Sequence, residues 1–131
     1  MERIQNAVEA FFQDYYSLYP RTGKKPFSNL GMAYIAFARE EKHLFELLFV
    51  NTGSGIQRKS MYELLNGTEG KVVYEINMAK TLGCMNPQEL FMKMWILIHG
   101  AACMSLTGDY DLTDVQTMGL LENTYQAFAG V

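Results

Sequence analysis

Two side chains with the chemistry of a binding site, Trp95 and His99, lie four residues apart in a long apolar stretch of the sequence. That spacing places them on one face of a helix. There, Trp95 would supply apolar area for stacking, and His99 would supply a polar group that orients a ligand or senses its charge. The alternative is structural: Trp95 is then a core residue, and His99 satisfies a buried backbone carbonyl.

Catalysis and metal binding are not expected of this chain. A catalytic histidine needs a nucleophile or a second histidine beside it. We expect neither close to His99, so we do not expect His99 to be catalytic. Cys84 and Cys103 form no Cys-x-x-Cys or Cys/His ligand pattern, so we interpret them as free, buried thiols in a reducing cytosol. With His43 and His99 as the only histidines and no Glu-x-x-His pair, a metal-carrying or enzymatic bundle is the least favoured class. We expect no cofactor.

The composition indicates a single domain over residues 1–131, because 49% of the residues are hydrophobic and the chain is too short for two cores. A net charge of −3 leaves no basic field for a phosphate backbone, so we expect no direct nucleic-acid binding. The first residues are amphipathic rather than a secretory signal. The longest uncharged apolar stretch, 94–104, is shorter than the ~20 residues that a membrane span needs. These features predict a cytoplasmic protein without a membrane partner.

Helical periodicity runs through most of the chain, and no stretch alternates long enough to predict a strand. Apolar residues recur at three- and four-residue steps in 4–19, 28–39, 41–50, 57–65, 69–82, 87–106 and 113–129. From these segments, some of them short, we expect an all-α fold, a single helical bundle of five to six helices. The segment 87–106 is apolar on nearly every side, which predicts that protein covers most of its length.

Capping residues mark several of these boundaries. Asn86 followed by Pro87 and Glu89 is the clearest helix start, with a capping side chain, a proline in the first turn and a capping-box glutamate. Thr113 and Gln116 form a second capping box. We also expect Ser28 to cap the helix that follows it, and Gly83 to end the helix that precedes it.

Two segments, 33–49 and 95–102, resemble the C-terminal domain of TetR/AcrR-family transcription regulators. The first reads Ala-Tyr-Ile-Ala-Phe-Ala-Arg-Glu and leads into a short helix rich in Leu and Phe; the second reads Trp-Ile-Leu-Ile-His-Gly-Ala-Ala. The match is to the subgroup named for a Trp, His and Gly motif. With the order of the helices, the resemblance covers essentially the whole chain. The family's helix-turn-helix would precede residue 4, and we expect the DNA-binding domain to be absent from this chain.

The resemblance implies a cytoplasmic homodimer that binds an apolar or aromatic effector. Our candidates for the ligand site combine the Trp/His pair with aromatic and methionine side chains: Phe12, Tyr34, Phe37, Met61, Tyr62, Tyr74, Met78, Trp95 and His99. Our candidates for the dimer interface lie on the last two helices, which pair between subunits in that family: Ile96, Gly100, Cys103, Met118, Leu121, Tyr125 and Phe128. For both sets the alternative is ordinary packing within one chain.

The expected function is therefore a small-molecule-sensing and dimerisation domain of a repressor-like regulator, without catalysis. In this interpretation the effector shifts the population between two packings of the bundle. The alternative is a ligand-free dimerisation module that modulates an intact regulator through mixed dimers.

Overall fold

The computed structural model describes Gln13, residues 25–46, Asn66 and residues 70–129. Five helices lie in these ranges: α2 (Ser28–Glu40), α3 (Lys42–Phe45), α5 (Lys71–Thr81), α6 (Pro87–Thr107) and α7 (Asp114–Ala129). The described residues contain no strand, which confirms the all-α bundle that the periodicity predicts. The predicted helices at 4–19 and 57–65, and the end of the one at 41–50, lie outside the described residues.

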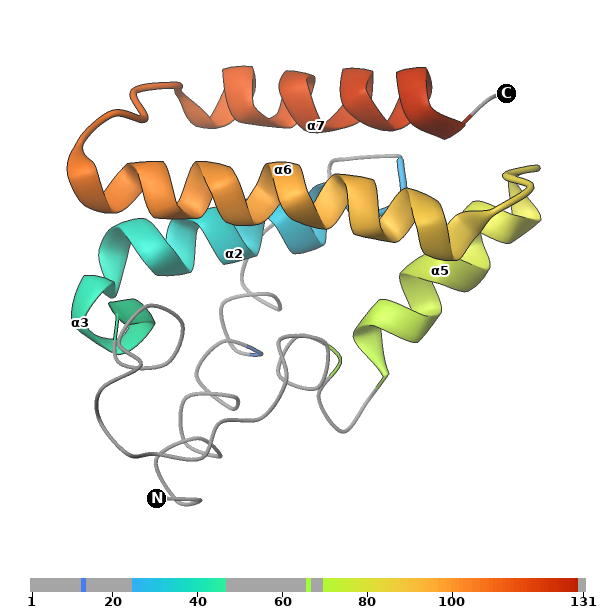
Figure 1. The fold of residues 1–131 in the computed structure, drawn as a ribbon, viewed down its shortest axis with the longest axis horizontal. Coiled ribbons are helices and arrows are strands. Elements are labelled where there is room, and N and C mark those ends of the chain that lie inside the picture. Colours follow the sequence, from blue (N-terminus) through green and yellow to red (C-terminus); the bar gives the residue numbers. More distant parts are fainter. Residues whose placement is uncertain (1–12, 14–24, 47–65, 67–69, 130–131) are drawn as a thin grey trace.

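The long helix α6 is the centre of the bundle. It runs alongside α7, with α2 on its other side in the view of Figure 1 and α5 near its N-terminal end. Helix α2 contacts both α6 and α7, and α5 contacts α6. The chain thus folds around two long helices joined by the short turn at 108–113.

Local hydrogen bonds explain where α6 and α7 begin. The side chain of Asn86 accepts a hydrogen bond from the backbone N–H of Glu89 at 3.2 Å and donates to its carboxylate at 2.9 Å. Before α7, the Thr113 hydroxyl accepts from the N–H of Gln116 at 3.1 Å, and the Gln116 amide oxygen accepts from the N–H of Thr113 at 2.9 Å. Both predicted helix starts are confirmed, since each satisfies donors that the first turn leaves free.

The end of α5 also follows its predicted glycine. Gly83 has a φ of 102°, and the N–H groups of Gly83 and Cys84 reach the carbonyls of Lys80 and Ala79 at 3.1 Å each. A left-handed residue just after a helix closes its last carbonyls in this way, and glycine adopts that conformation without strain.

The start of α2 differs from the prediction. Ser28 is the first helical residue rather than the cap, and its buried hydroxyl makes no hydrogen bond. Phe27 occupies the cap position with a φ of 71°, which costs a non-glycine residue about 1–2 kcal/mol. The backbone N–H of Phe27 donates to the buried Glu75 carboxylate of α5 at 3.1 Å. An acceptor from another helix therefore satisfies the N–H of the residue at the cap position, and no side chain caps the helix locally.

The core lies where α2 meets α6 and α7. Ten residues of α2 are buried. At Gly31, α2 lies close to both α6 and α7. A Cβ atom at Gly31 would lie 3.0 Å from side-chain atoms of both Ile98 and Leu121. Gly31 thus sets how closely α2 packs against the two long helices.

Helix α6 is covered on only part of its surface. It is long and apolar enough to span a membrane by length and composition, with a mean hydropathy of 1.4, but the core helix of a soluble protein passes the same test. Its inner face buries Leu90, Met94 and Ile98, whereas Ile96 is 66% exposed. The prediction that protein covers most of this helix is therefore not met within the described part of the chain.

Candidate functional site

A polar and aromatic cluster joins α2 to α6 at Tyr34, Trp95, His99 and Cys103. The three α6 residues follow each other at four-residue steps, so they share one face of that helix. Tyr34 of α2 faces them, and its hydroxyl lies 2.9 Å from Nδ1 of His99. We call these four residues the His99 cluster.

Aromatic rings flank the imidazole, which is partly buried. The ring of Trp95 stacks on His99 at a centroid distance of 5.3 Å and an interplanar angle of 29°. Tyr34 meets Trp95 edge-on at 4.8 Å, and Phe45 of α3 meets Tyr34 edge-on at 5.6 Å. Such tilted and offset arrangements are those that aromatic pairs favour. The rings fix the orientation of the imidazole as well as its surroundings.

Burial makes the cluster electrically neutral near pH 7. Desolvation lowers the pKa of His99 from its ordinary value, because removal from water disfavours the imidazolium. Desolvation, followed by the proximity of Cys103, raises the pKa of Tyr34 well above its ordinary value. Desolvation also raises the pKa of Cys103. The cluster therefore contains neutral hydrogen-bonding groups rather than a charge.

Cys103 corrects two expectations. Its Sγ lies 3.5 Å from Nε2 of His99, so His99 does have a thiol beside it. Cys103 is only partly buried, unlike Cys84, which is 6% exposed. The four-residue spacing between His99 and Cys103 was the signal that could have found this pair.

The predicted ligand residues separate into groups. Tyr34, Trp95 and His99 come together in the His99 cluster. Phe37 is buried in the core with the rest of α2. On α5, Tyr74 is 55% exposed and Met78 is partly buried. Phe12, Met61 and Tyr62 lie outside the described residues.

The predicted dimer residues are also divided between surface and interior. Ile96 and Phe128 are 66% and 47% exposed, whereas Leu121 and Tyr125 are buried within the chain. Gly100, Cys103 and Met118 are partly buried. Phe128 lines a small hollow at the start of α6, whereas Ile96 and Gly100 line a larger hollow between α6 and α7.

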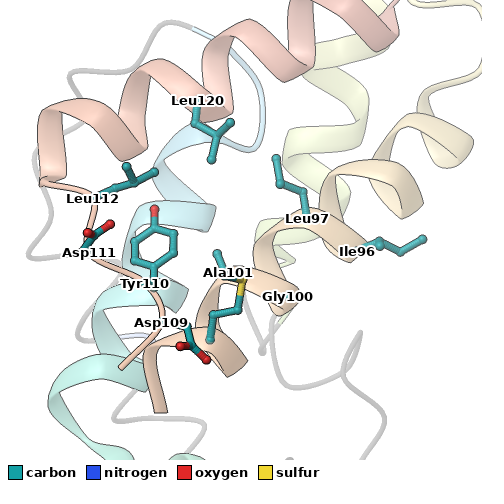
Figure 2. A pocket seen from close by; sticks show the side chains of 10 residues that line it. Ile96, Leu97, Gly100, Ala101, Asp109, Tyr110, Asp111, Leu112 and Leu120 are labelled. Carbon is teal, nitrogen blue, oxygen red and sulfur yellow. The ribbon is translucent and has the colours of Figure 1, made fainter. Parts of the chain in front are cut away.

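That hollow, the α6–α7 groove, has a volume of about 370 Å³ and is mostly apolar (Figure 2). Asp109 and Asp111 of the turn after α6 lie at one end of it. The other lining residues are Ile96, Leu97, Gly100, Ala101, Met104, Tyr110, Leu112 and Leu120. Sequence analysis identified Ile96 and Gly100 but missed Met104, although it follows them at the same four-residue step.

Metal chemistry finds no site in these residues. The described residues contain no group of three or more His, Cys, Asp or Glu side chains that could hold a metal ion.

No family model matches this sequence, and no curated protein or solved structure matches it either. The His99 cluster and the α6–α7 groove are the candidate sites in the described part of the chain.

Proposed function

We propose that this chain is a non-catalytic sensing domain of a TetR-like regulator, which binds an apolar or aromatic small molecule beside the His99 cluster. The observation that carries the proposal is a neutral imidazole surrounded by aromatic rings, with Tyr34 Oη 2.9 Å from Nδ1. Binding sites for small molecules combine apolar walls with a few placed polar groups. The cluster has that composition, and it joins two helices that a ligand could move relative to each other.

The proposal includes pairing with a second copy through the outer face of α6 and α7. Ile96 and Met104 are 66% and 47% exposed beside the α6–α7 groove. A Cβ added at Gly100 would meet no described atom within 4 Å, so a partner helix has room to approach there. Contiguous apolar surface of this kind is typical of interfaces.

One observation favours the second candidate, a ligand-free dimerisation module. Both ring nitrogens of His99 already face partners within the chain, Tyr34 and Cys103. A cluster closed on itself needs no ligand to satisfy its polar groups. The module would then act through mixed dimers with an intact regulator, and only the α6–α7 surface would serve function.

The chain offers a matched control for the test of ligand binding. His43 on α3 is exposed, and His99 lies in the cluster, so His99→Gln and His43→Gln make the same change at two contrasting sites. We would first screen the protein against a library of apolar and aromatic compounds by native mass spectrometry and thermal shift. We expect the affinity for a stabilising ligand to fall about tenfold or more in His99→Gln and to be retained in His43→Gln. No hit across the library would favour the ligand-free module.

Self-association has its own matched pair. Ile96 on the groove and Val115 at the start of α7 are both exposed, at 66% and 83%. We expect Ile96→Asp to shift sedimentation from dimer to monomer, because an interfacial carboxylate loses water without gaining a partner. Val115→Asp should remain dimeric. A wild-type protein that sediments as a monomer would contradict the interface in both candidate functions.

A further inference from the structure

Cys103 differs from the other thiol of the chain in its surroundings. Its Sγ is 3.5 Å from Nε2 of His99, and its side chain is partly exposed. Cys84 is buried in the turn after α5. Desolvation, followed by the proximity of Cys84, raises the pKa of Tyr125. One molecule therefore contains a thiol beside a base and a thiol without one.

Tyr34 positions the imidazole for this contact. In the tautomer that carries its proton on Nδ1, His99 donates to Tyr34 Oη across 2.9 Å, and the lone pair of Nε2 is left to accept the thiol proton. Stacking on Trp95 at 5.3 Å holds the ring in the same orientation. A nucleophile, a base and a group that orients the base are the parts of an activated nucleophile.

The resting pair is neutral rather than an ion pair. Desolvation raises the pKa of Cys103 and lowers that of His99, so the thiol keeps its proton until it reacts. A thiol in this state needs the base during the reaction itself, when the developing thiolate transfers its proton to Nε2.

We propose that Cys103 is a covalent acceptor site for soft electrophiles of the α,β-unsaturated carbonyl class, with His99 as its base and Tyr34 as a positioning residue. This inference deepens the proposed sensing function and depends on it for its biological meaning, because it names the chemical class of the effector.

The reaction balances without a further reagent. The Sγ electron pair forms a bond to the β-carbon while the carbon–carbon π bond shifts towards the carbonyl to give an enolate. The thiol proton passes to Nε2 of His99 and then to the α-carbon of the enolate. No group leaves and nothing is oxidised, so the product is a thioether on α6. Its bulk separates Sγ from the imidazole and disturbs the Tyr34 contact between α6 and α2.

The test uses the full chain and N-ethylmaleimide, an α,β-unsaturated dicarbonyl compound. Labelling rates of Cys103 and Cys84 are followed at pH 7 by quenching and peptide mass spectrometry, in the wild type and in His99→Gln, His43→Gln and Tyr34→Phe. Labelling in denaturant provides the intrinsic rate of each thiol. Circular dichroism of each variant checks that the fold is retained.

We expect Cys103 to react at least about tenfold faster than Cys84 in the folded protein, and the two rates to converge in denaturant. Since a positioned general base contributes about 10²–10⁴-fold, His99→Gln should slow Cys103 at least about tenfold without affecting Cys84. His43→Gln should change neither rate. Tyr34→Phe keeps the imidazole and should slow Cys103 several-fold, which preserves the test if His99→Gln unfolds.

Two results would overturn the inference: a Cys103 rate that is unchanged in both His99→Gln and Tyr34→Phe, or one no faster than that of Cys84. The first would mean that exposure alone sets the rate. A screen of reversible ligands on Cys103→Ala separates this inference from the sensing function. Ligand binding retained by Cys103→Ala, with slow labelling of the wild type, would reject the covalent site and leave the sensor standing. Fast, His99-dependent labelling without any reversible ligand would support the covalent site and reject only a sensor that binds its effector reversibly.

Discussion

The inner and outer faces of α6 have nearly the same composition and opposite surroundings. Leu90, Met94 and Ile98 lie at four-residue steps on the inner face and are at most 3% exposed. Met92 and Ile96, also four apart, are 53% and 66% exposed on the outer face. An apolar helix thus completes the core of its own chain with one face and leaves the other exposed. Composition alone does not tell the two faces apart.

The largest effect that would test this comparison is a pair of methionine truncations. Met94 is fully buried and Met92 is 53% exposed, two residues away on the same helix. We expect Met94→Ala to lower the free energy of unfolding by about 2–5 kcal/mol, because it removes buried contacts and leaves a cavity. Met92→Ala should change it by about 0.5 kcal/mol or less. Urea unfolding of the monomeric form measures both.

Equal losses at Met92 and Met94 would show that the outer face is buried within the chain after all. A loss at Met92 that appears only at high protein concentration would instead locate Met92 in the interface between copies, since association stabilises the folded state by mass action.

The substitution of two glycines by alanine gives the next largest effect. We expect the resulting change in stability to have opposite signs on the two faces. A Cβ at Gly31 would lie 3.0 Å from Ile98 and Leu121, whereas one at Gly100 would meet no described atom within 4 Å. We expect Gly31→Ala to destabilise the fold by about 1–3 kcal/mol through overpacking. Gly100→Ala should stabilise the isolated chain by up to about 1 kcal/mol, because alanine is the better helix former.

Thermal unfolding of the two glycine variants, supported by sedimentation, distinguishes the faces. A partner helix that approaches Gly100 closely would make Gly100→Ala weaken self-association while it strengthens the monomer. Destabilisation of the monomer by Gly100→Ala would place this glycine in a contact within the chain.

The smallest effect concerns the third face of α6, which carries the His99 cluster. The pKa of His99 is lowered in the folded state, whereas an unfolded histidine titrates near about 6.5. At a pH between these two pKa values, the unfolded chain binds more protons than the folded protein does. The free energy of unfolding is therefore highest above about pH 6.5 and falls as the pH drops from there towards the pKa of folded His99. His99→Gln should flatten this part of the stability profile.

Unfolding free energies measured from pH 7 to pH 5 check this prediction. A profile for His99→Gln that parallels the wild type would mean that His99 titrates in the folded protein as it does in the unfolded chain.

The sequence predicts the local features of this fold well. Asn86 and Glu89 start α6 and Thr113 and Gln116 start α7 because each cap needs only residues three positions apart. The face shared by Trp95 and His99 follows from helical spacing in the same way. The contact of that face with Tyr34, 65 residues before His99, was not predicted, because no local rule connects residues so far apart in the chain.

What the sequence could not provide involves residues far apart in the chain. Ser28 has the right chemistry for a cap, yet the acceptor at the start of α2 is Glu75, 48 residues from Phe27. The split of the predicted interface between exposed Ile96 and buried Tyr125 depends likewise on how α2 lies across α6 and α7. Periodicity finds an apolar face, but only the tertiary packing determines which neighbour covers it.

The bond between Phe27 and Glu75 also bears on the order in which the chain folds. The hydrogen bond at the start of α2 uses an acceptor 48 residues away, so it cannot form until the intervening chain has closed. Closing such a loop carries an entropic cost that local capping avoids, and contacts distant in sequence slow folding. The starts of α6 and α7 are self-contained, so these two helices are available as an early hairpin. The hydrogen bond between the start of α2 and α5 would then form later.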